Sequence, residues 1–264
     1  MRIFYFGNNW VGRKILQYLV ERDEDIIGLA VHPPHRSKYR NDIIQISGLT
    51  ESYIFDGSRL SEPDTMESIR KLMPEIGISV FFGYMISRNL LDVFPLECVN
   101  VHPSFLPYNR GAHPNIWSIL ECTPAGATIH YVDNGIDTGD IIAQKEVPVE
   151  PIDTGKTLYH KLECACVKLF MDTWPIIRAG NACRIPQSIK NGTYHRSKDV
   201  EKIDEIDLDR TYMARELIDT IRARTFSPYT GSYFVSEKRK VYMRLQLFFE
   251  DDLIRDSGHN NDKN

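Results

Sequence analysis

Residues 2–31 decide the fold class, and they read RIFYFGNNWVGRKILQYLVERDEDIIGLAV. The run at 2–6 favours a β-strand and stops at Gly7. The residues that follow favour a helix, because apolar side chains recur at helical spacing. These side chains are Val11, Ile15, Leu16 and Leu19. Residues 26–31 then predict a second buried strand, ended by the turn-forming sequence His32-Pro33-Pro34. This order of strand, glycine loop, helix and strand is the start of a parallel α/β sheet.

Further strands and one long helix follow along the chain. Residues 76–82 and 99–102 predict two more buried strands. Apolar and polar residues alternate along 125–131 and again along 141–149, which is typical of half-buried strands. Residues 157–178 predict a helix that ends before Gly180 and packs across the sheet. Its apolar stripe consists of Leu158, Leu162, Ala165, Leu169, Phe170, Trp174 and Ile177.

The composition becomes polar after residue 180, so we expect a second, smaller unit there. Residues 211–224 predict a short amphipathic helix, and the segments 229–235 and 240–247 predict a β-hairpin. We therefore divide the chain into an α/β domain at 1–180, a small helix-and-hairpin subdomain at 181–250, and a tail at 251–264 that we expect to be disordered. The hairpin could also form the interface of a homodimer.

Composition and charge exclude several classes of protein. The 264 residues are 42% hydrophobic and 26% charged, as in an ordinary globular protein. The 32 basic and 36 acidic residues give a net charge of −4, which disfavours non-specific binding of nucleic acid. The five cysteines have no metal-ligand spacing, so we expect no metal site, and their odd number fits reduced thiols. We find neither a secretory leader nor an apolar stretch of about 18 residues, so we expect a cytoplasmic protein that does not span a membrane.

The loop from Gly7 to Gly12 lies where nucleotides bind in many α/β proteins. Its sequence, GNNWVG, matches neither the dinucleotide fingerprint nor the P-loop. No acidic residue ends the second strand to hold a ribose, so we do not expect a nicotinamide cofactor. Two interpretations stay open. The loop is a simple strand-to-helix turn, or Asn8, Asn9 and Trp10 line a ligand cleft at the carboxyl end of the first strand.

Chemically useful side chains concentrate between residues 98 and 144. Asn100 and His102 are two apart on a strand, so their side chains project to the same face, and Pro103 ends that strand. Asp137 lies in a loop flanked by Gly135 and Gly139 that can reach the same edge. An amide, an imidazole and a carboxylate that converge there could perform acyl transfer. The alternative is a structural histidine beside a proline and an ordinary turn.

Four stretches carry a resemblance to a known family. They are Phe82-Gly83-Tyr84-Met85-Ile86, Asn100-Val101-His102-Pro103-Ser104-x-Leu106-Pro107, Arg110-Gly111-Ala112-His113-Pro114 and Gly135-Ile136-Asp137-Thr138-Gly139-Asp140. In this order and spacing they resemble the formyltransferases that use 10-formyltetrahydrofolate as their co-substrate. One departure is Ser87, where many relatives have proline. The resemblance agrees with an α/β fold: a Rossmann-like, mostly parallel twisted sheet with flanking helices, plus the small C-terminal helix and hairpin.

The resemblance also implies roles for individual residues. Asn100, His102 and Asp137 correspond to the catalytic residues of the family, with Asp137 orienting His102. The folate is expected to bind Phe82, Gly83, Tyr84, Met85, Ile86 and Asp133. His113 and His130 have no role assigned by the resemblance, and we interpret them as packing or solvent-facing residues. We interpret Asp140 as a turn residue.

The C-terminal third indicates the acceptor. The stretches Gly192-Thr193-Tyr194-His195-Arg196, Ile206-Asp207-Leu208 and residues 221–231 resemble sugar-nucleotide N-formyltransferases, above all those acting on dTDP-4-amino-4,6-dideoxyglucose. Such an enzyme would serve the synthesis of surface polysaccharide, the O-antigen of lipopolysaccharide. Trp10, Phe226 and Tyr229 could stack on the nucleotide base, and Asn9 and Arg222 could make polar contacts, although each could equally be a packing residue.

Other functions stay open at this point. The acceptor could be a dTDP-3-amino sugar or GDP-perosamine. A methionyl-tRNA formyltransferase would be expected to carry a further β-barrel domain, and a formyltetrahydrofolate hydrolase a regulatory domain in front. A binding module without catalytic activity would not need Asn100, His102 and Asp137 together.

Overall fold

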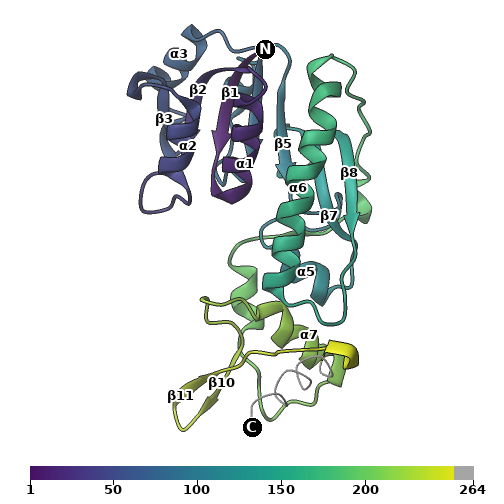
Figure 1. Ribbon diagram of the computed structural model, residues 1–264. Helices are drawn as coiled ribbons and strands as arrows, with labels where there is room; N and C mark the ends of the chain where they lie inside the picture. The colour runs from purple at the N-terminus through teal and green to yellow at the C-terminus, as the bar shows by residue number, and fades with distance from the viewer. Residues whose placement is uncertain (253–264) are drawn as a thin grey trace, which may run out of the picture.

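A seven-stranded sheet forms the centre of the computed structural model, which describes residues 1–252 (Figure 1). Its strands are β1 (Arg2–Gly7), β2 (Asp25–Val31), β3 (Ile54–Asp56), β4 (Ile76–Val80), β5 (Cys98–His102), β7 (Ala125–Tyr131) and β8 (Ile141–Val147). They lie in the order β3-β2-β1-β4-β5-β7-β8. The first five are parallel to one another, and β7 and β8 are antiparallel to their neighbours. The prediction of a mostly parallel α/β sheet is confirmed.

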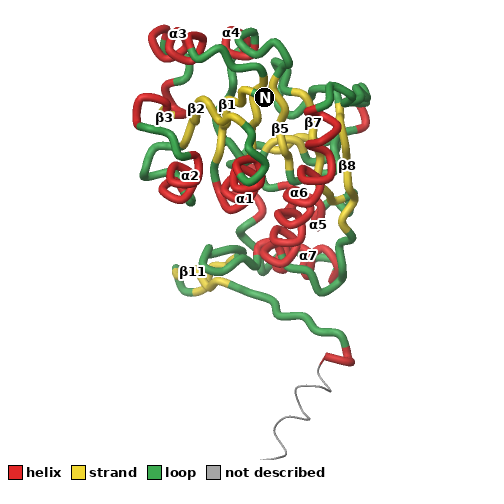
Figure 2. The backbone as a smooth tube through the Cα atoms, turned by 45° about the horizontal axis from the view of Figure 1, so that its top comes forward, coloured by secondary structure: helices red, strands yellow, loops and turns green. Residues whose placement is uncertain are grey.

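Helices cover both faces of this sheet (Figure 2). One face packs against α1 (Asn9–Val20), α2 (Arg40–Ser47), α5 (Pro114–Leu120) and α6 (Gly155–Arg178); the other packs against α3 (Pro63–Lys71) and α4 (Arg88–Leu91). Strand β1 shows why both faces are apolar. Ile3 and Tyr5 belong to the core under α1 and α6, whereas Phe4 and Phe6 belong to the core under α3 and α4. Successive side chains of a strand point to opposite faces, so a strand buried on both sides is apolar throughout.

Strand β7 departs from the half-buried pattern that its alternating sequence suggests. Six of its seven residues are buried. The apolar ones join the core against α6, and Thr128 on the other face donates a hydrogen bond to the Ser104 carbonyl and accepts one from Leu106 N–H. The segment after β5 therefore covers the face expected to meet solvent. The polar residues of β7 are buried because they have partners in the protein.

The long helix α6 begins two residues before the predicted start, because Thr154 caps it. The Thr154 side chain accepts from Thr157 N–H, and the Thr157 hydroxyl accepts from Thr154 N–H in return. The helix ends at Arg178, and Gly180 follows with a φ of 71°, a conformation that glycine adopts without strain. The predicted apolar stripe is buried against β7 and β8.

The chain order places a crevice at one edge of the sheet. From β1 the chain builds outward through β2 and β3 on one side, and through β4 and β5 on the other. The loops that leave the carboxyl ends of β1 and β4 therefore diverge, and such a point is where open α/β sheets bind ligands. Residues 8–9 follow β1, and residues 81–87 lead from β4 to α4.

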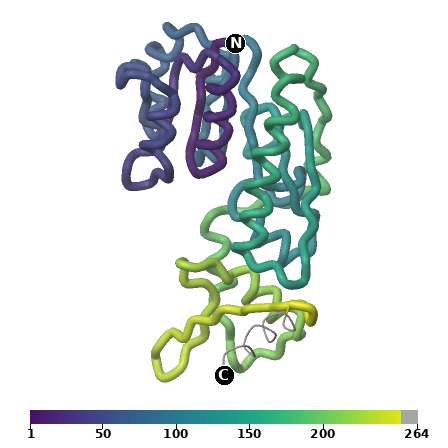
Figure 3. Tube along the Cα trace, in the orientation of Figure 1, coloured from purple at the N-terminus to yellow at the C-terminus, as the bar shows by residue number. Residues whose placement is uncertain are grey.

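The residues after α6 first return to the sheet and then extend away from it. Ile185 pairs with Ile141, and β9 (Tyr194–His195) pairs in parallel with the short strand β6 (Arg110–Gly111). Helix α7 (Ala214–Arg224) and the hairpin β10 (Tyr233–Ser236) and β11 (Arg239–Tyr242) lie beyond the end of the sheet (Figures 1 and 3). The short helices η1 (Glu51–Tyr53), η2 (Gly57–Arg59), η3 (Ile189–Asn191) and η4 (Asp199–Ile203) complete the elements.

This arrangement bears on the predicted division of the chain. The hairpin strands are shorter than the predicted segments 229–235 and 240–247. The domain boundary at residue 180 stays a prediction, but residues 185–195 pack against the α/β part. The disorder expected for 251–264 falls almost wholly outside the described residues. Among residues 1–252, no helix has the length and apolar character needed to cross a bilayer.

Candidate active site

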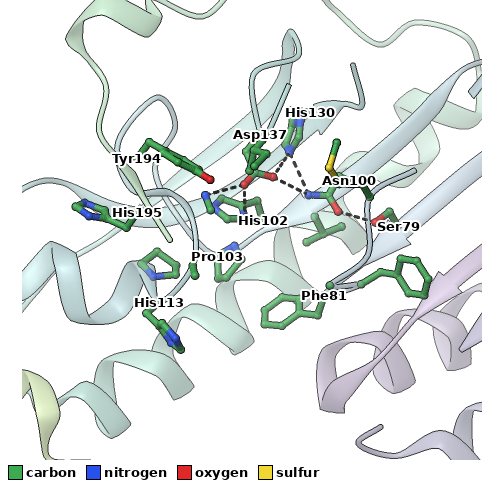
Figure 4. A pocket seen from close by; sticks show the side chains of 18 of the residues that line it. Ser79, Phe81, Asn100, His102, Pro103, His113, His130, Asp137, Tyr194 and His195 are labelled. Carbon is green, nitrogen blue, oxygen red and sulfur yellow. Dashed lines mark hydrogen bonds and ion pairs between the residues drawn. The ribbon is translucent and has the colours of Figure 1, made fainter. Parts of the chain in front are cut away.

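A cavity of about 590 Å³ opens at the carboxyl ends of β4 and β5 (Figure 4). Its walls come from the loop after β4, the end of β5, the segment 111–115, the loop after β7, Tyr159 of α6 and residues 194–197. Segments that are far apart in the sequence therefore meet around one space, of the size that small-molecule sites commonly have. The residues from 194 onward belong to the predicted C-terminal subdomain, so that part of the chain completes the cavity.

The three predicted catalytic side chains lie together on the wall of this cavity (Figure 4). Asp137 Oδ2 lies 3.6 Å from His102 Nδ1, and Asp137 Oδ1 lies 3.5 Å from Asn100 Nδ2. Gly111 N–H donates to Asp137 Oδ2 at 2.9 Å. The structure thus brings an amide, an imidazole and a carboxylate to one sheet edge.

Burial and charge set the protonation of this group. Burial lowers the pKa of His102 most, and the positive charge of His130 when protonated adds to it, whereas Asp137 and the Asn109 carbonyl act in the opposite direction. Burial disfavours the charged form of Asp137, but the two imidazoles and the Gly111 N–H outweigh it and hold the pKa of that carboxyl well below its usual range. At neutral pH the site therefore contains a carboxylate beside a neutral imidazole.

Both ring nitrogens of His102 have an acceptor within reach. Its Nε2 lies 3.3 Å from the Asn109 carbonyl oxygen, and its Nδ1 faces Asp137. Both ring nitrogens thus face acceptor oxygens, although a neutral imidazole has only one N–H to donate. A second proton on this ring would find an acceptor already in place. His102 is suited to take up a proton during a reaction and to release it again.

His130 belongs to the same group and was not predicted as a site residue. Its Nδ1 lies 2.7 Å from the Tyr131 carbonyl, which only an N–H can satisfy, so Nε2 carries the lone pair and accepts from Asn100 Nδ2 at 3.1 Å. Ser79 Oγ donates to Asn100 Oδ1 at 2.8 Å. These two contacts fix which way the Asn100 amide points. His130 is buried, in agreement with the packing role considered for it, but that interpretation did not include its contact with Asn100. Asn100 and His130 are neighbours because the register of β5 and β7 pairs them, and this register could not be predicted from the sequence.

The loop that carries Asp137 is held by neighbours from both sides. Asp137 has a φ of 53°, in the left-handed region that residues other than glycine rarely adopt. Gln187 Nε2 donates to the carbonyls of Asp137 and Gly139, at 3.0 and 2.6 Å. Asp140 of the same loop pairs with Arg184 at 3.1 Å, and its predicted turn role stays a prediction. The residues after α6 thus hold the carboxylate in place.

The predicted folate residues form one side of the cavity. Phe82, Gly83, Tyr84, Met85, Ile86 and Asp133 all line it. Phe82 packs on Phe6 with ring centroids 5.4 Å apart, which anchors this side to the core. Asp133 Oδ1 accepts from Gly135 N–H and from the Thr138 hydroxyl, so its side chain shapes the turn before Asp137. Among residues 1–252, no three His, Cys, Asp or Glu side chains are grouped as metal ligands would be.

On the opposite side, Tyr159 connects the cavity to several predicted acceptor residues. Asn9 Nδ2 donates to the Tyr159 hydroxyl, and the ring of Phe226 lies 5.4 Å from that of Tyr159. Tyr229 packs edge-on against Phe226 and accepts a hydrogen bond from Lys38 at 3.0 Å. Tyr159 and Lys38 were not predicted as site residues. The fold places Tyr159 against Phe226 and Lys38 against Tyr229.

Arg222 and Trp10, the other two predicted acceptor residues, have different surroundings. Arg222 is buried and donates to Asp219 and to the carbonyls of Glu150 and Asp153. Its guanidinium joins α7 to the segment before α6, so its prediction as a polar contact for the sugar nucleotide is corrected. Trp10, in the first turn of α1, is partly buried against the core, and the Lys14 ammonium lies 6.0 Å from its ring centroid.

Comparison with known proteins identifies the family. Residues 10–173 match the model of the formyl transferase family, and residues 199–248 match the N-formyltransferase dimerization C-terminal domain. The chain belongs to the formyl transferase family. The resemblance seen in the sequence motifs is thereby confirmed.

Individual formyl transferases show how much of the chain is shared. A methionyl-tRNA formyltransferase of Agathobacter rectalis is 30% identical over 240 residues, which cover 88% of this chain and 76% of that protein. The structure of a 4-N formyltransferase from Francisella tularensis is 29% identical, with a TM-score of 0.77, and the match covers 94% of this chain and 98% of that one. The formyltransferase PseJ from Anoxybacillus kamchatkensis, solved with UDP-4,6-dideoxy-4-formamido-L-AltNAc and tetrahydrofolate, is 35% identical, with a TM-score of 0.56 over 76% of this chain and 89% of that one.

Proposed function

We propose that this protein transfers the formyl group of 10-formyltetrahydrofolate to the amine of a nucleotide-linked amino sugar. The observation that carries the proposal is the Asp137 carboxyl group beside His102 and Asn100 on the cavity wall. Acyl transfer needs donors for a developing oxyanion and a group that moves a proton, and these side chains provide both.

The reaction follows from the chemistry of these groups. The neutral sugar amine attacks the formyl carbon, a C–N bond forms, and the formyl oxygen becomes an oxyanion that Asn100 and His102 hold as hydrogen-bond donors. The amine proton passes to the pair of His102 and Asp137. The C=O bond re-forms as the bond to the folate nitrogen breaks, and that nitrogen takes up the proton. A deprotonated amine is already nucleophilic, so no covalent enzyme intermediate is needed.

The cavity fits a folate on its aromatic side. A pteridine is flat and rich in hydrogen-bonding groups, so it suits a wall that combines rings with exposed backbone. Phe82, Tyr84 and Ile86 supply the apolar surface, and Gly83 leaves the backbone accessible between them. The PseJ structure, which contains tetrahydrofolate, supports a folate for this chain.

Several observations favour an amino sugar as acceptor. The structure of the 4-N formyltransferase matches this chain over nearly its whole length, and the formamido sugar bound to PseJ carries its formyl group at position 4. Asn9, Phe226 and Tyr229 supply an amide and two rings on the side of Tyr159, where a nucleotide could stack. Within this class we propose dTDP-4-amino-4,6-dideoxyglucose, which would be formylated for an O-antigen. The sugar in PseJ is linked to UDP, which makes a UDP-linked 4-amino sugar the first alternative.

Methionyl-tRNA is a second candidate acceptor, because several curated relatives are methionyl-tRNA formyltransferases. The charge of the chain counts against it. A net charge of −4 gives little of the phosphate attraction on which tRNA binding depends.

We also propose that the protein is a homodimer formed through its C-terminal segment. Residues 199–248 match a dimerization domain, and the hairpin within them exposes Val235, Val241 and Tyr242. Exposed apolar residues that lie close together are typical of association surfaces.

The function is tested with a panel of acceptors in the presence of 10-formyltetrahydrofolate, scored by the mass gain of one formyl group. The panel contains dTDP-linked 3-amino and 4-amino sugars, a UDP-linked 4-amino sugar, GDP-perosamine and methionyl-tRNA. We expect formylation of dTDP-4-amino-4,6-dideoxyglucose and none of the tRNA. Formylation of the tRNA alone would overturn the proposal, and release of formate without any acceptor would indicate a hydrolase.

A further inference from the structure

His32 contacts the loop on the folate side of the cavity from behind. It follows β2 and is only 6% exposed. Its Nε2 accepts a hydrogen bond from Gly83 N–H at 3.1 Å. Its ring packs edge-on against Phe82 and Tyr84, with centroid distances of 5.2 and 4.8 Å. His32 itself is not part of the cavity wall.

This hydrogen bond is the main polar attachment of the loop. Within the described part of the chain, the bond from Gly83 to His32 is the only one that involves the backbone of residues 82–86. Packing of Phe82 and Ile86 supplies the remaining restraint. The backbone groups that we expect to bind the folate therefore depend on His32 for their position.

The protonation state of His32 decides whether the bond exists. An imidazole nitrogen accepts a hydrogen bond only when it carries a lone pair, so the bond from Gly83 requires an unprotonated Nε2 in His32. A second proton would place an N–H on Nε2 that points at Gly83 N–H. Two donors would then face each other, and the loop would lose its attachment.

We propose that neutral His32 is a positioning residue for the folate, and that its protonation weakens folate binding by releasing the loop of residues 82–86. The inference rests on the proposed function, because it takes this loop as the folate-binding wall. His32 does not touch the reacting atoms.

The groups around His32 keep it neutral at physiological pH. Burial is the largest influence and lowers its pKa, and the charge of Arg36 acts in the same direction. The backbone of Arg36 and the carboxylate of Asp56, at the end of β3, raise the pKa by less. The titratable side chain of Tyr84 also contacts the His32 ring. The Arg36 guanidinium lies over the Tyr84 ring, 5.3 Å from its centroid. Loss of the bond is therefore expected only at a pH below the ordinary pKa of histidine, about 6.5.

The test measures the binding of 5-formyltetrahydrofolate, a stable isomer of the proposed co-substrate, by calorimetry from about pH 7.5 to about pH 5.5. The variants are His32→Leu, which cannot accept a hydrogen bond, and His32→Gln, whose side-chain oxygen accepts one at every pH. His35→Gln is the matched control, because His35 is an exposed histidine of the same loop.

We expect His32→Leu to bind about tenfold more weakly at neutral pH, the effect of one lost hydrogen bond. His32→Gln should bind like the wild type at neutral pH and lose less affinity than the wild type on acidification, while His35→Gln should follow the wild type throughout. In turnover assays, His32→Leu should raise the KM for the folate and leave kcat and the KM for the acceptor unchanged.

Two results overturn the inference and leave the proposed function intact: unchanged affinity in His32→Leu, or an undiminished loss on acidification in His32→Gln. A wild-type protein that binds no folate at all would overturn the proposed function and the inference with it.

Discussion

At the scale of single residues, Asp137 is the centre of the site. Its two oxygens face His102, His130, the Asn100 amide and the Gly111 N–H. A carboxylate with this many partners stays ionised, and burial makes each interaction stronger than it would be in water. One negative charge therefore lies at the centre of the polar groups of the site.

His130 is expected to act through Asn100. The substitution His130→Leu removes the acceptor that orients the Asn100 amide. We expect kcat to fall about tenfold, because one hydrogen bond of about 1.4 kcal/mol corresponds to that factor. His130→Gln, which can still accept, should recover part of the rate. Steady-state rates at saturating substrates measure this, and an unchanged kcat in His130→Leu would exclude the positioning role.

Part of this site can be read from the sequence, and part of it depends on the fold. Asn100 and His102 share a face because strand periodicity places residues two apart together. The glycine-flanked loop showed only that Asp137 could reach this edge, and the family resemblance favoured that interpretation over an ordinary turn, since no local rule says where a loop folds. His130 and Gln187 reach the site through strand register and the return of the chain after α6. Such contacts between distant segments leave no mark in a single sequence.

At the scale of elements, the pairing of β6 with β9 joins the C-terminal segment to the strand whose Gly111 contacts Asp137. Gly111 in β6 has a φ of 87°, and a Cβ atom there would lie 2.4 Å from the His195 carbonyl oxygen. Its N–H is also the backbone donor to Asp137. No other amino acid satisfies the conformation and the close approach together.

We therefore expect Gly111→Ala to lower both stability and activity. Forcing this conformation costs about 1–3 kcal/mol, which corresponds to a decrease in Tm of several degrees. Gly180→Ala is the matched control. Its φ is also positive, at 71°, but no atom lies within 4 Å of its Cβ position, and it follows the end of α6. Thermal denaturation and kcat check this: if Gly111→Ala loses no more activity than Gly180→Ala, the close approach does not matter.

Elements were predicted best where periodicity is strong. Strands β1 and β2 and helices α1 and α6 follow directly from apolar spacing. The burial of β7 on both faces was not predicted, because its polar residues are satisfied by the segment after β5, whose position only the tertiary structure sets. The hairpin strands β10 and β11 are shorter than expected, since β-propensity does not indicate where pairing stops.

At the scale of the whole molecule, buried histidines make stability depend on pH. Burial is the main cause that lowers the pKa of His32, His102 and His113, and the charge of Arg224 adds to it for His113. These rings stay neutral in the folded protein below pH 6.5, where the unfolded chain binds protons. Stability therefore falls as the pH decreases from about 6.5 toward the lower pKa values of the folded state.

We expect a lower Tm at about pH 5 than at about pH 7.5, measured by thermal denaturation. His113→Asn removes one of the three groups, and asparagine tolerates the φ of 57° found there. Its Tm should change less with pH than that of the wild type. An equal or higher Tm at the acidic pH would contradict the account of these histidines.

The association of two chains is tested at the hairpin. Val241→Asp and Tyr242→Asp place a charge on its exposed apolar face and should shift the protein toward the monomer in size-exclusion chromatography with light scattering. Met73→Asp is the control, because Met73 is 71% exposed and follows α3, far from the hairpin in sequence. A wild-type protein that elutes as a monomer would contradict the proposed dimer.

The most direct test of the account compares the single-turnover rate of formyl transfer in Asp137→Asn and Asp140→Asn. Both substitutions remove one negative charge from the same loop, but Asp137 faces His102 whereas Asp140 pairs with Arg184. With bound amino sugar and 10-formyltetrahydrofolate, we predict a loss of about 100-fold or more in Asp137→Asn and a rate near that of the wild type in Asp140→Asn. A near-normal rate in a folded Asp137→Asn protein would contradict the role of this carboxylate in the reaction.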